Sequence, residues 1–441
     1  MTKHKVLFRN FSALGVVQIA NYILPLFVVP IISRILGPEK LGLIAYLASY
    51  MTYFTLLINF GFDLTATRRL IKDPNNIQLR NRIFSEIFFA KLFLLMISFF
   101  IFCFFLTKIP FLYQNKLLAS YAFLVCFGSV FSNNWIFQVM QDLPKVAFFD
   151  FLGKTIVNVL ILLTIKTQAD YYWYVILTSL IIIFIAIINF ITAINKYKIK
   201  ISFIKLNEIL TLLNNEKTYF FTVIIITLYT TTNTIILGNL TDPISIGYFI
   251  AGQKFIIITY SVINMPLVSA LFPLIGEAFV VQKSKGLNLI QRILPFVFYL
   301  TFIIGIVLFF CGPYLLVWFY GEKFRPSIGV FKILTFIPLI IALANLCGSQ
   351  IMLNLKMDKM YFKITLTGAI FSIISNYYFI SKLGFIGSAW VWLFTEIFIL
   401  AIHLIYLSRL KIYPINLKYF LPYFILKEFK SLKNLAFNKL K

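Results

Sequence analysis

The sequence predicts an all-α polytopic membrane protein with about twelve transmembrane helices, arranged as two six-helix bundles around a central cavity. The 441-residue chain is 61% hydrophobic and 12% charged, with a mean hydropathy of +0.91. A soluble domain does not tolerate such a composition, because its surface would be apolar. Twelve apolar stretches are long enough to cross hydrocarbon, and one long polar connection divides them into six and six.

Each stretch supplies the roughly 20 residues that a helix needs to cross about 30 Å of hydrocarbon. The first stretch follows a short basic segment and has no small-residue cleavage site, so we expect a retained span and not a removed signal peptide. The expected spans lie at 11–35, 42–62, 86–106, 117–140, 146–166, 172–194, 218–238, 244–272, 293–311, 329–355, 361–381 and 384–407.

The polar connections predict the domain organisation. The connection at 195–217 separates an N-terminal six-helix bundle, residues 1–200, from a C-terminal six-helix bundle, residues 201–410. Halves of this kind are often structural repeats in transporters. In residues 411–441, apolar residues recur at helical spacing with lysines between them. This pattern predicts a basic amphipathic tail on the cytoplasmic surface of the membrane.

The distribution of basic residues predicts the orientation. The formal net charge is +25, and 27 of the 40 Lys and Arg residues fall in one set of alternate loops and termini, against eight in the other set. Cytoplasmic loops collect Lys and Arg, so both termini are predicted to be cytoplasmic. Topology and attraction to anionic lipids account for the excess, and nucleic acid is not an expected partner.

Lys254 is the first candidate for substrate binding. It lies about ten residues into the apolar run that begins near Ile244, where a lysine costs roughly 3 kcal/mol and is expected to face a protein cavity. Lys91 lies one turn into the third span, where it can line the cavity or snorkel to the interface. Arg34 ends the first span as an outer anchor or a gate cation. An anionic substrate in a cationic cavity is the simplest interpretation.

The first span contains two prolines, Pro25 and Pro30, five residues apart. Each removes one helical hydrogen bond and bends the helix, so the pair predicts a gating hinge. The alternative is a static kink in a packed helix. Asn21 lies beside the bend, where a freed carbonyl group needs a polar partner or water. We therefore expect Asn21 to line the cavity.

Polar and aromatic residues gather at the cytoplasmic end of the fourth span. Trp135 and Gln138 lie there with Asn133, Asn134 and Gln141. Amides hydrogen-bond sugar hydroxyls and an indole face stacks on a sugar ring, which makes Trp135 and Gln138 candidates for substrate binding. A tryptophan is also common at the membrane interface without any such role.

Three acidic or basic residues within the spans are candidates for ion coupling. Glu396 and His403 are seven residues apart on one face of the twelfth span; the alternative is a lysine partner for Glu396 and an interfacial His403. Asp150 precedes Lys154 by four residues, so the two can also neutralise each other. The remaining histidine and the four scattered cysteines have no metal-site spacing. No metal, cofactor or catalytic site is predicted, and the chain is not expected to be an enzyme.

Several segments resemble Wzx-type polysaccharide flippases of the multidrug/oligosaccharidyl-lipid/polysaccharide exporter superfamily. Trp135–Gln138 is similar to the family's W-x-x-Q-G-x-E segment, although Val139 and Gln141 stand where Gly and Glu are frequent. The resemblance covers nearly the whole chain in matching order. Its other residues are Arg9, Asn10, Phe11, Ser12, Gln18, Asn21, Tyr22, Pro25, Pro30, Arg34, Leu36, Gly37, Pro38, Gly42, Asn59 to Phe62, Gly247, Tyr248, Ala251, Lys254 and Phe319 to Phe324.

The resemblance implies a flippase that moves an undecaprenyl-diphosphate-linked oligosaccharide, such as an O-antigen or capsule repeat unit, to the outer leaflet of a bacterial inner membrane. It also implies alternating access of the two bundles. The implied partners are membrane lipids, a polysaccharide polymerase and a chain-length regulator.

Two alternatives to a flippase remain. A cation-coupled multidrug or metabolite antiporter shares the architecture but usually has acidic lumen residues. A membrane polysaccharide polymerase or glycosyltransferase is expected to carry a substantial outer loop, and the longest here, 312–328, is short.

Overall fold

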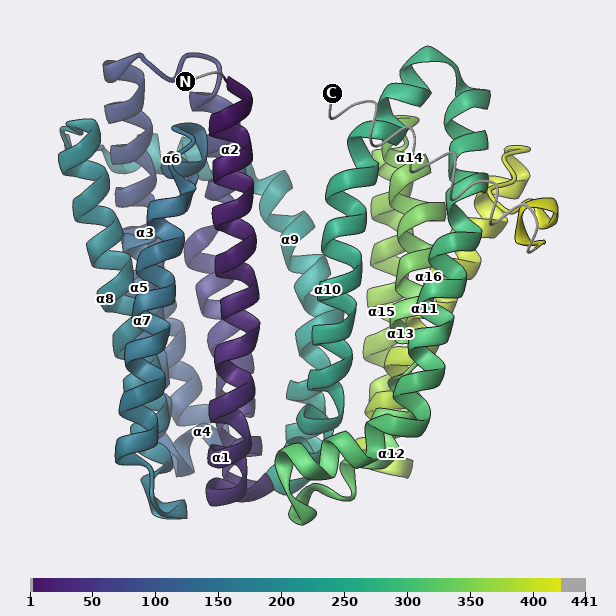
Figure 1. Cartoon of the computed structure of the whole chain (residues 1–441). Helices are drawn as coiled ribbons and strands as arrows, with labels where there is room; N and C mark the ends of the chain where they lie inside the picture. The colour runs from purple at the N-terminus through teal and green to yellow at the C-terminus, as the bar shows by residue number, and fades with distance from the viewer. Residues whose placement is uncertain (1–2, 422–441) are drawn as a thin grey trace. The chain divides into compact units, whose positions relative to one another are not determined.

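The computed structural model describes the backbone of residues 3–421. Its description of side chains leaves out residues 3–26, 222, 226, 229, 230, 264–270, 272 and 273. Within this part of the chain the structure consists of helices and loops without β-strands, which confirms the all-α prediction (Figure 1). Ten helical segments among the described residues are long and apolar enough to cross a membrane. The chain forms two compact units, Met1–Gly238 and Asn239–Lys441.

Within the described residues, unit 1 contains nine helices and one short 3-10 turn. The central ones for the site are α3, which carries Lys91, and the broken pair α5 and α6. Their bounds are α1 Lys3–Asn59, α2 Phe62–Leu70, α3 Ile77–Lys108, α4 Pro110–Gln114, α5 Lys116–Phe131, α6 Asn134–Val139, α7 Leu143–Thr164, η1 Gln168–Asp170, α8 Tyr171–Tyr197 and α9 Leu206–Leu240.

Unit 2 contains the remaining helices. The long helices α10, α11, α15 and α16 pack with a helical series that is interrupted by a π-helix. The bounds are α10 Pro243–Val281, α11 Lys283–Tyr320, η2 Glu322–Phe324, α12 Ser327–Leu334, α13 Ile337–Ala344, the π-helix η3 Asn345–Gln350, α14 Ile351–Asn354, α15 Asp358–Leu383, α16 Phe385–Arg409 and η4 Leu417–Phe420.

The first two expected spans form one helical element, α1, that is broken at Gly37. Gly37 has φ 73° and ψ 175°, whereas the helix continues on both sides of it. An L-residue is strained at such an angle and glycine is not, so the Leu-Gly-Pro sequence fixes the turn. Pro30 lies within the continuous helix before the break.

The division between the units falls at the end of α9, later than the boundary expected near residue 200. Side chains of α9 pack on unit 1: the Phe220 ring stacks on Phe60 with centroids 4.2 Å apart, and the Tyr53 hydroxyl is 2.5 Å from Thr232 Oγ1. Gly238 lies so close to the Tyr46 ring that a Cβ atom there would be 2.4 Å from Cε2. These contacts join α9 to α1 and to the turn that follows it.

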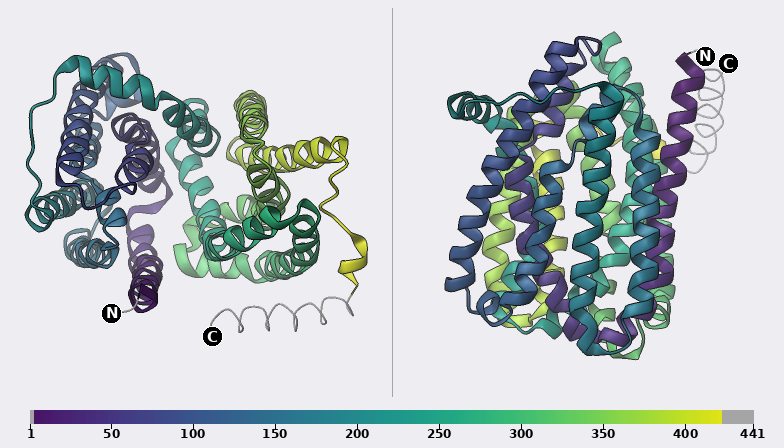
Figure 2. Two further views of the ribbon diagram at one scale, coloured as in Figure 1. Left: turned by 90° about the horizontal axis from the view of Figure 1, so that it is seen from above. Right: turned by 90° about the vertical axis from the view of Figure 1, so that its left-hand side faces the viewer.

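Figure 2 shows how α8 is connected to α9 in unit 1. In its right-hand view the connection appears as a thin teal line that crosses the bundle before the first turns of α9. The chain from residue 199 to residue 205 has no helical structure. The basic tail predicted for residues 411–441 lies outside the described residues from residue 422 onward.

The break at Gly37 gives a first prediction. We expect Gly37→Ala to destabilise the protein by roughly 1–2 kcal/mol, because a side chain is strained at positive φ. Thermal unfolding of the purified protein, followed by fluorescence-detected size-exclusion chromatography, measures the loss. The matched control is Gly276→Ala, a helical site where, among the described side chains, only Asn354 Oδ1, at 3.2 Å, lies within 4 Å of an added Cβ. Equal stability of the two variants would contradict the assignment of the turn to Gly37.

Candidate functional site

Lys254 is exposed near the middle of a span. Asp242 caps α10 by accepting a hydrogen bond from the Ser245 amide at 2.8 Å, and Pro243 occupies the first turn; both features fix where this helix begins. Lys254 follows eleven residues later, about 17 Å along the helix axis at 1.5 Å per residue. Ile246 and Phe249 are buried on the same helix, whereas Lys254 is exposed. The helix thus carries an exposed cation near the middle of the span.

Lys91 is bound inside unit 1 and does not snorkel to the interface. Its side chain is fully buried, and Nζ donates to the carbonyl oxygens of Ser129 at 3.2 Å and Ser132 at 2.7 Å. These carbonyls lie at the end of α5, where the chain leaves helical geometry before α6. The last carbonyls of a helix need a donor, and a cation complements their partial negative charge. Lys91 therefore stabilises the break between α5 and α6.

The two candidates for sugar binding both lie on the short helix α6, but one is buried and the other is exposed. Trp135 is fully buried and its ring lies 6.2 Å, centroid to centroid, from that of Phe84. Gln138 is exposed on the same helix. In this structure Trp135 packs in the core of unit 1 and offers no ring face to a ligand, whereas the Gln138 amide is accessible.

Four candidate residues lie on α1, and the structure describes the side chains of two of them, Arg34 and Pro30. Arg34 is exposed, three residues before the break at Gly37. Pro30 is partly exposed within the helix. The side chains of Asn21 and Pro25 lie outside the described residues, so their predicted roles in lining the cavity and in bending remain proposals.

Asp150 and Lys154 occupy successive turns of α7. Asp150 is partly buried and Lys154 is exposed, and the positive charge of Lys154 acts on Asp150. The i,i+4 spacing therefore brings the two opposite charges to one helix face.

Glu396 and His403 lie in a buried polar cluster of unit 2. Glu396 is 5% exposed, and its Oε1 accepts a hydrogen bond from Trp392 Nε1 at 3.3 Å. The hydroxyl groups of Tyr260 on α10 and Tyr361 on α15 are close enough to interact electrostatically with this carboxylate. His403 is 2% exposed and stacks on Tyr361, with ring centroids 5.6 Å apart and an interplanar angle of 8°.

The π-helix η3 shapes this cluster. Gly348 lies against His403, where a Cβ atom would be 2.5 Å from Cε1, and Asn345 forms a hydrogen bond with Tyr260. Among the described residues neither ring nitrogen of His403 has a hydrogen-bond partner. Isolated π-helical turns are frequent at functional sites. Sequence alone does not point to Asn345, because no periodic pattern marks a π-helix. It does not point to Tyr260 and Tyr361 either, because helices distant in the sequence bring them to Glu396 and His403.

The fold and these residues define a multi-pass α-helical membrane protein. Two bundles of long apolar helices carry a cation exposed at mid-span and a buried carboxylate. The sequence profile of the family described as "Polysaccharide biosynthesis protein" matches residues 7–279, more than half of the chain. The chain belongs to this family.

This chain matches two curated relatives over almost the full length of each. Both are named "Putative O-antigen transporter". The protein from Escherichia coli (strain K12) is 25% identical over 408 residues, which cover 92% of this chain and 97% of the relative. The protein from Shigella dysenteriae is 24% identical over 396 residues, which cover 89% of this chain and 97% of the relative.

Two solved structures share the fold at low sequence identity. A structure described as "Lipid II flippase MurJ, inward closed conformation" matches with a TM-score of 0.71 at 16% identity and covers 96% of this chain and 92% of its own. An inward-facing multidrug resistance MATE family transporter of the MOP superfamily matches with a TM-score of 0.70 at 16% identity, covering 90% and 94%.

The geometry around Lys91 predicts that its removal affects folding. We expect Lys91→Met to lower membrane abundance and thermal stability, because the two carbonyl groups at the α5 break lose their donor at a cost of about 1–3 kcal/mol each. Lys363→Met, which changes an exposed lysine near the start of α15, is the matched control. A Lys91→Met protein with normal abundance and stability but no transport would contradict the structural role and return Lys91 to substrate binding.

Proposed function

We propose that the protein is a flippase that moves an undecaprenyl-diphosphate-linked oligosaccharide, an O-antigen, capsule or similar repeat unit, from the cytoplasmic to the outer leaflet of a bacterial inner membrane. Family membership and the names of the two relatives support this proposal. The fold shared with a lipid II flippase supports it as well. The excess of Lys and Arg in alternate loops supports a cytoplasmic location for both termini.

The observation that carries the proposal is the exposed ammonium group of Lys254 at mid-span. A lysine is costly in contact with lipid, so we assign it to a polar, water-containing cavity. There its ammonium group can form charge-assisted hydrogen bonds with a diphosphate, which are stronger at low dielectric constant than in water. The bilayer would still surround the lipid tail while the headgroup crosses.

Other exposed side chains suit the remainder of the substrate. Arg34 would attract the diphosphate at the end of the first span, and the Gln138 amide would hydrogen-bond sugar hydroxyls. Asn21 would line the cavity beside a hinge at Pro25 and Pro30. Access would alternate between the two sides of the membrane, and a polysaccharide polymerase with its chain-length regulator would receive the product.

For coupling to an ion gradient we assign the proton carrier to the cluster of Glu396 and His403. A proton that binds to Glu396 changes the charge of a nearly inaccessible region by one unit, and Tyr260 and Tyr361 on neighbouring helices interact with that charge. Asp150 is the second candidate, although Lys154 offsets its charge.

Replacement of Lys254 tests the cationic cavity. We expect Lys254→Ala to reduce delivery of the lipid-linked glycan to the outer leaflet by about tenfold or more. The reason is that the variant loses one charge-assisted hydrogen bond to the diphosphate, and the free energy of such a bond corresponds to a rate change of this size. Lys254→Arg should restore most of it, because it retains the positive charge. Periplasmic glycan ligation at matched membrane abundance is the measurement, with Lys283→Ala as the exposed control. Normal export by Lys254→Ala would exclude Lys254 from the transport path.

Replacement of Glu396 tests the coupling. Glu396→Gln keeps the size of the side chain and its capacity to accept from Trp392, but it cannot release a proton. We expect glycan translocation in inverted membrane vesicles to lose its dependence on an imposed pH gradient while the protein stays folded. A variant whose response to the gradient equals that of the parent would remove Glu396 from the coupling step.

A further inference from the structure

The segment that connects α8 to α9, residues 198–212, has two chemically different faces; we call it the strap. Its inner face inserts Ile199, Ile204, Ile209 and Leu212 into the core of unit 1, where each is less than 9% exposed. Non-helical chain from residue 199 to residue 205 is followed by the first turns of α9. The inner face therefore anchors the strap along its whole length.

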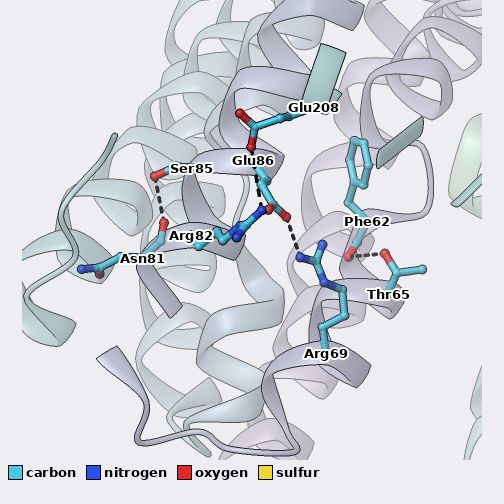
Figure 3. A network of polar contacts seen from close by, with 8 residues as sticks. All are labelled: Phe62, Thr65, Arg69, Asn81, Arg82, Ser85, Glu86 and Glu208. Atoms are coloured by element: carbon cyan, nitrogen blue, oxygen red, sulfur yellow. Dashed lines mark hydrogen bonds and ion pairs between the residues drawn. The ribbon is translucent and has the colours of Figure 1, made fainter. Parts of the chain in front are cut away.

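Polar contacts with α3 add to this anchoring. The main-chain amides of Lys200 and Ser202 donate to Asn81 Oδ1 at 3.2 Å and to Ser85 Oγ at 3.0 Å. Figure 3 shows the ion pairs that attach the start of α9 to α3, in which Arg82 lies between Glu86 and Glu208. Arg82 contacts Glu208 at 3.8 Å and Glu86 at 2.8 Å.

Glu86 also joins the network to α2. Its Oε2 lies 2.5 Å from Arg69 Nη2. Glu216, further along α9, is buried, and burial raises the pKa of its carboxyl group against the opposing effect of the Arg69 charge. Glu86 and Glu216 thus face arginines of unit 1, whereas Glu208, the acidic residue within the strap, is 46% exposed and contacts Arg82.

The outer face combines apolar side chains with lysines. Phe203 is 80% exposed, and Ile201, Leu206 and Leu210 are 40–52% exposed. Lys198, Lys200 and Lys205 are exposed beside them, and residues 198–207 contain no acidic side chain. An apolar surface with lysines at its margin is the composition of segments that lie in a membrane interface.

The contacts with α3 place the strap at the depth of that interface. The Phe203 ring meets Phe89 edge to face, with centroids 5.4 Å apart, and Phe89 is three residues inside the span expected at 86–106. Lys200 is bonded instead to Asn81, eight residues earlier on α3 and therefore about 12 Å further from the membrane centre. Relative to the span expected at 86–106, Phe203 therefore lies beside its cytoplasmic end and the main chain of Lys200 lies outside it.

We propose that the outer face of the strap binds anionic phospholipids of the cytoplasmic leaflet. Phosphate groups would contact Lys198, Lys200 and Lys205, and Phe203 would contact the acyl chains. Charge complementarity favours an anionic lipid over a zwitterionic one. Because α9 continues from the strap, bound lipid holds the start of α9 against α3. The leaflet assignment rests on the cytoplasmic orientation within the proposed function, whereas the lipid preference does not.

A quenching experiment on the full-length protein tests the preference. Phe203→Cys, in a chain whose four native cysteines are replaced by serine, is labelled with bimane and reconstituted in nanodiscs. Brominated phosphatidylglycerol or brominated phosphatidylcholine is supplied at equal mole fraction in the same lipid background. We expect quenching by the phosphatidylglycerol to be about twofold stronger or more. Equal quenching by the two lipids, or none by either, would overturn the proposal.

Charge variants identify the groups responsible. The combination Lys198→Gln, Lys200→Gln and Lys205→Gln should abolish the preference for phosphatidylglycerol. The matched combination Lys283→Gln, Lys285→Gln and Lys359→Gln, which removes three exposed lysines of unit 2, should retain it. Loss in both combinations would overturn the assignment to the strap. Displacement of brominated phosphatidylglycerol by equimolar undecaprenyl diphosphate would overturn it in favour of the lipid carrier.

The two leaflets of a nanodisc have the same composition and no transport takes place, so this measurement does not depend on glycan translocation. Failure of the lipid preference with intact glycan export would contradict the strap proposal alone. Failure of export with an intact lipid preference would contradict the proposed function alone.

Discussion

The structure depends on one constraint: hydrocarbon cannot hydrogen-bond, so each polar group within the spans must find a partner in the protein or in water. Lys91 meets the constraint by donating to two carbonyl groups at the break between α5 and α6. Tyr46 and Tyr50 meet it by pairing their buried hydroxyl groups at 3.2 Å. Lys254 meets it in neither way, because its side chain is exposed at mid-span. That difference is why we assign Lys254, and not Lys91, to the substrate.

Much of the fold follows from sequence because the same constraint acts residue by residue. Apolar runs of sufficient length predicted the all-α architecture. The interval between the first two expected spans, residues 36–41, contains Gly37, whose positive φ angle breaks α1. The resemblance to polysaccharide flippases is confirmed by the family profile over residues 7–279 and by the fold shared with MurJ. The i,i+4 spacing of Asp150 and Lys154 needed no tertiary information, because a single helix sets it.

The candidate site was less predictable because it depends on tertiary contacts. Periodicity does not distinguish a snorkelling Lys91 from one that turns inward, since the break it stabilises belongs to another helix. Trp135 and Gln138 share one polar and aromatic segment, yet packing against Phe84 buries the first and leaves the second exposed. Glu396 accepts from Trp392 on its own helix, but the two tyrosines that its charge influences lie on α10 and α15, and a π-helix lies beside them. The distribution of basic residues indicated orientation, but the alternation of buried and exposed side chains along the strap required the structure.

Direct translocation of a lipid-linked oligosaccharide by the purified protein is the most direct test of the central claim. Proteoliposomes would contain an undecaprenyl-diphosphate oligosaccharide with a fluorescent sugar, distributed over both leaflets, and an impermeant reductant would be added outside. Protein-free vesicles lose about half of the fluorescence, because the reductant reaches the outer leaflet only. The account predicts nearly complete loss when the protein is present. A loss that stays near half, with protein shown to be folded and inserted, would contradict it.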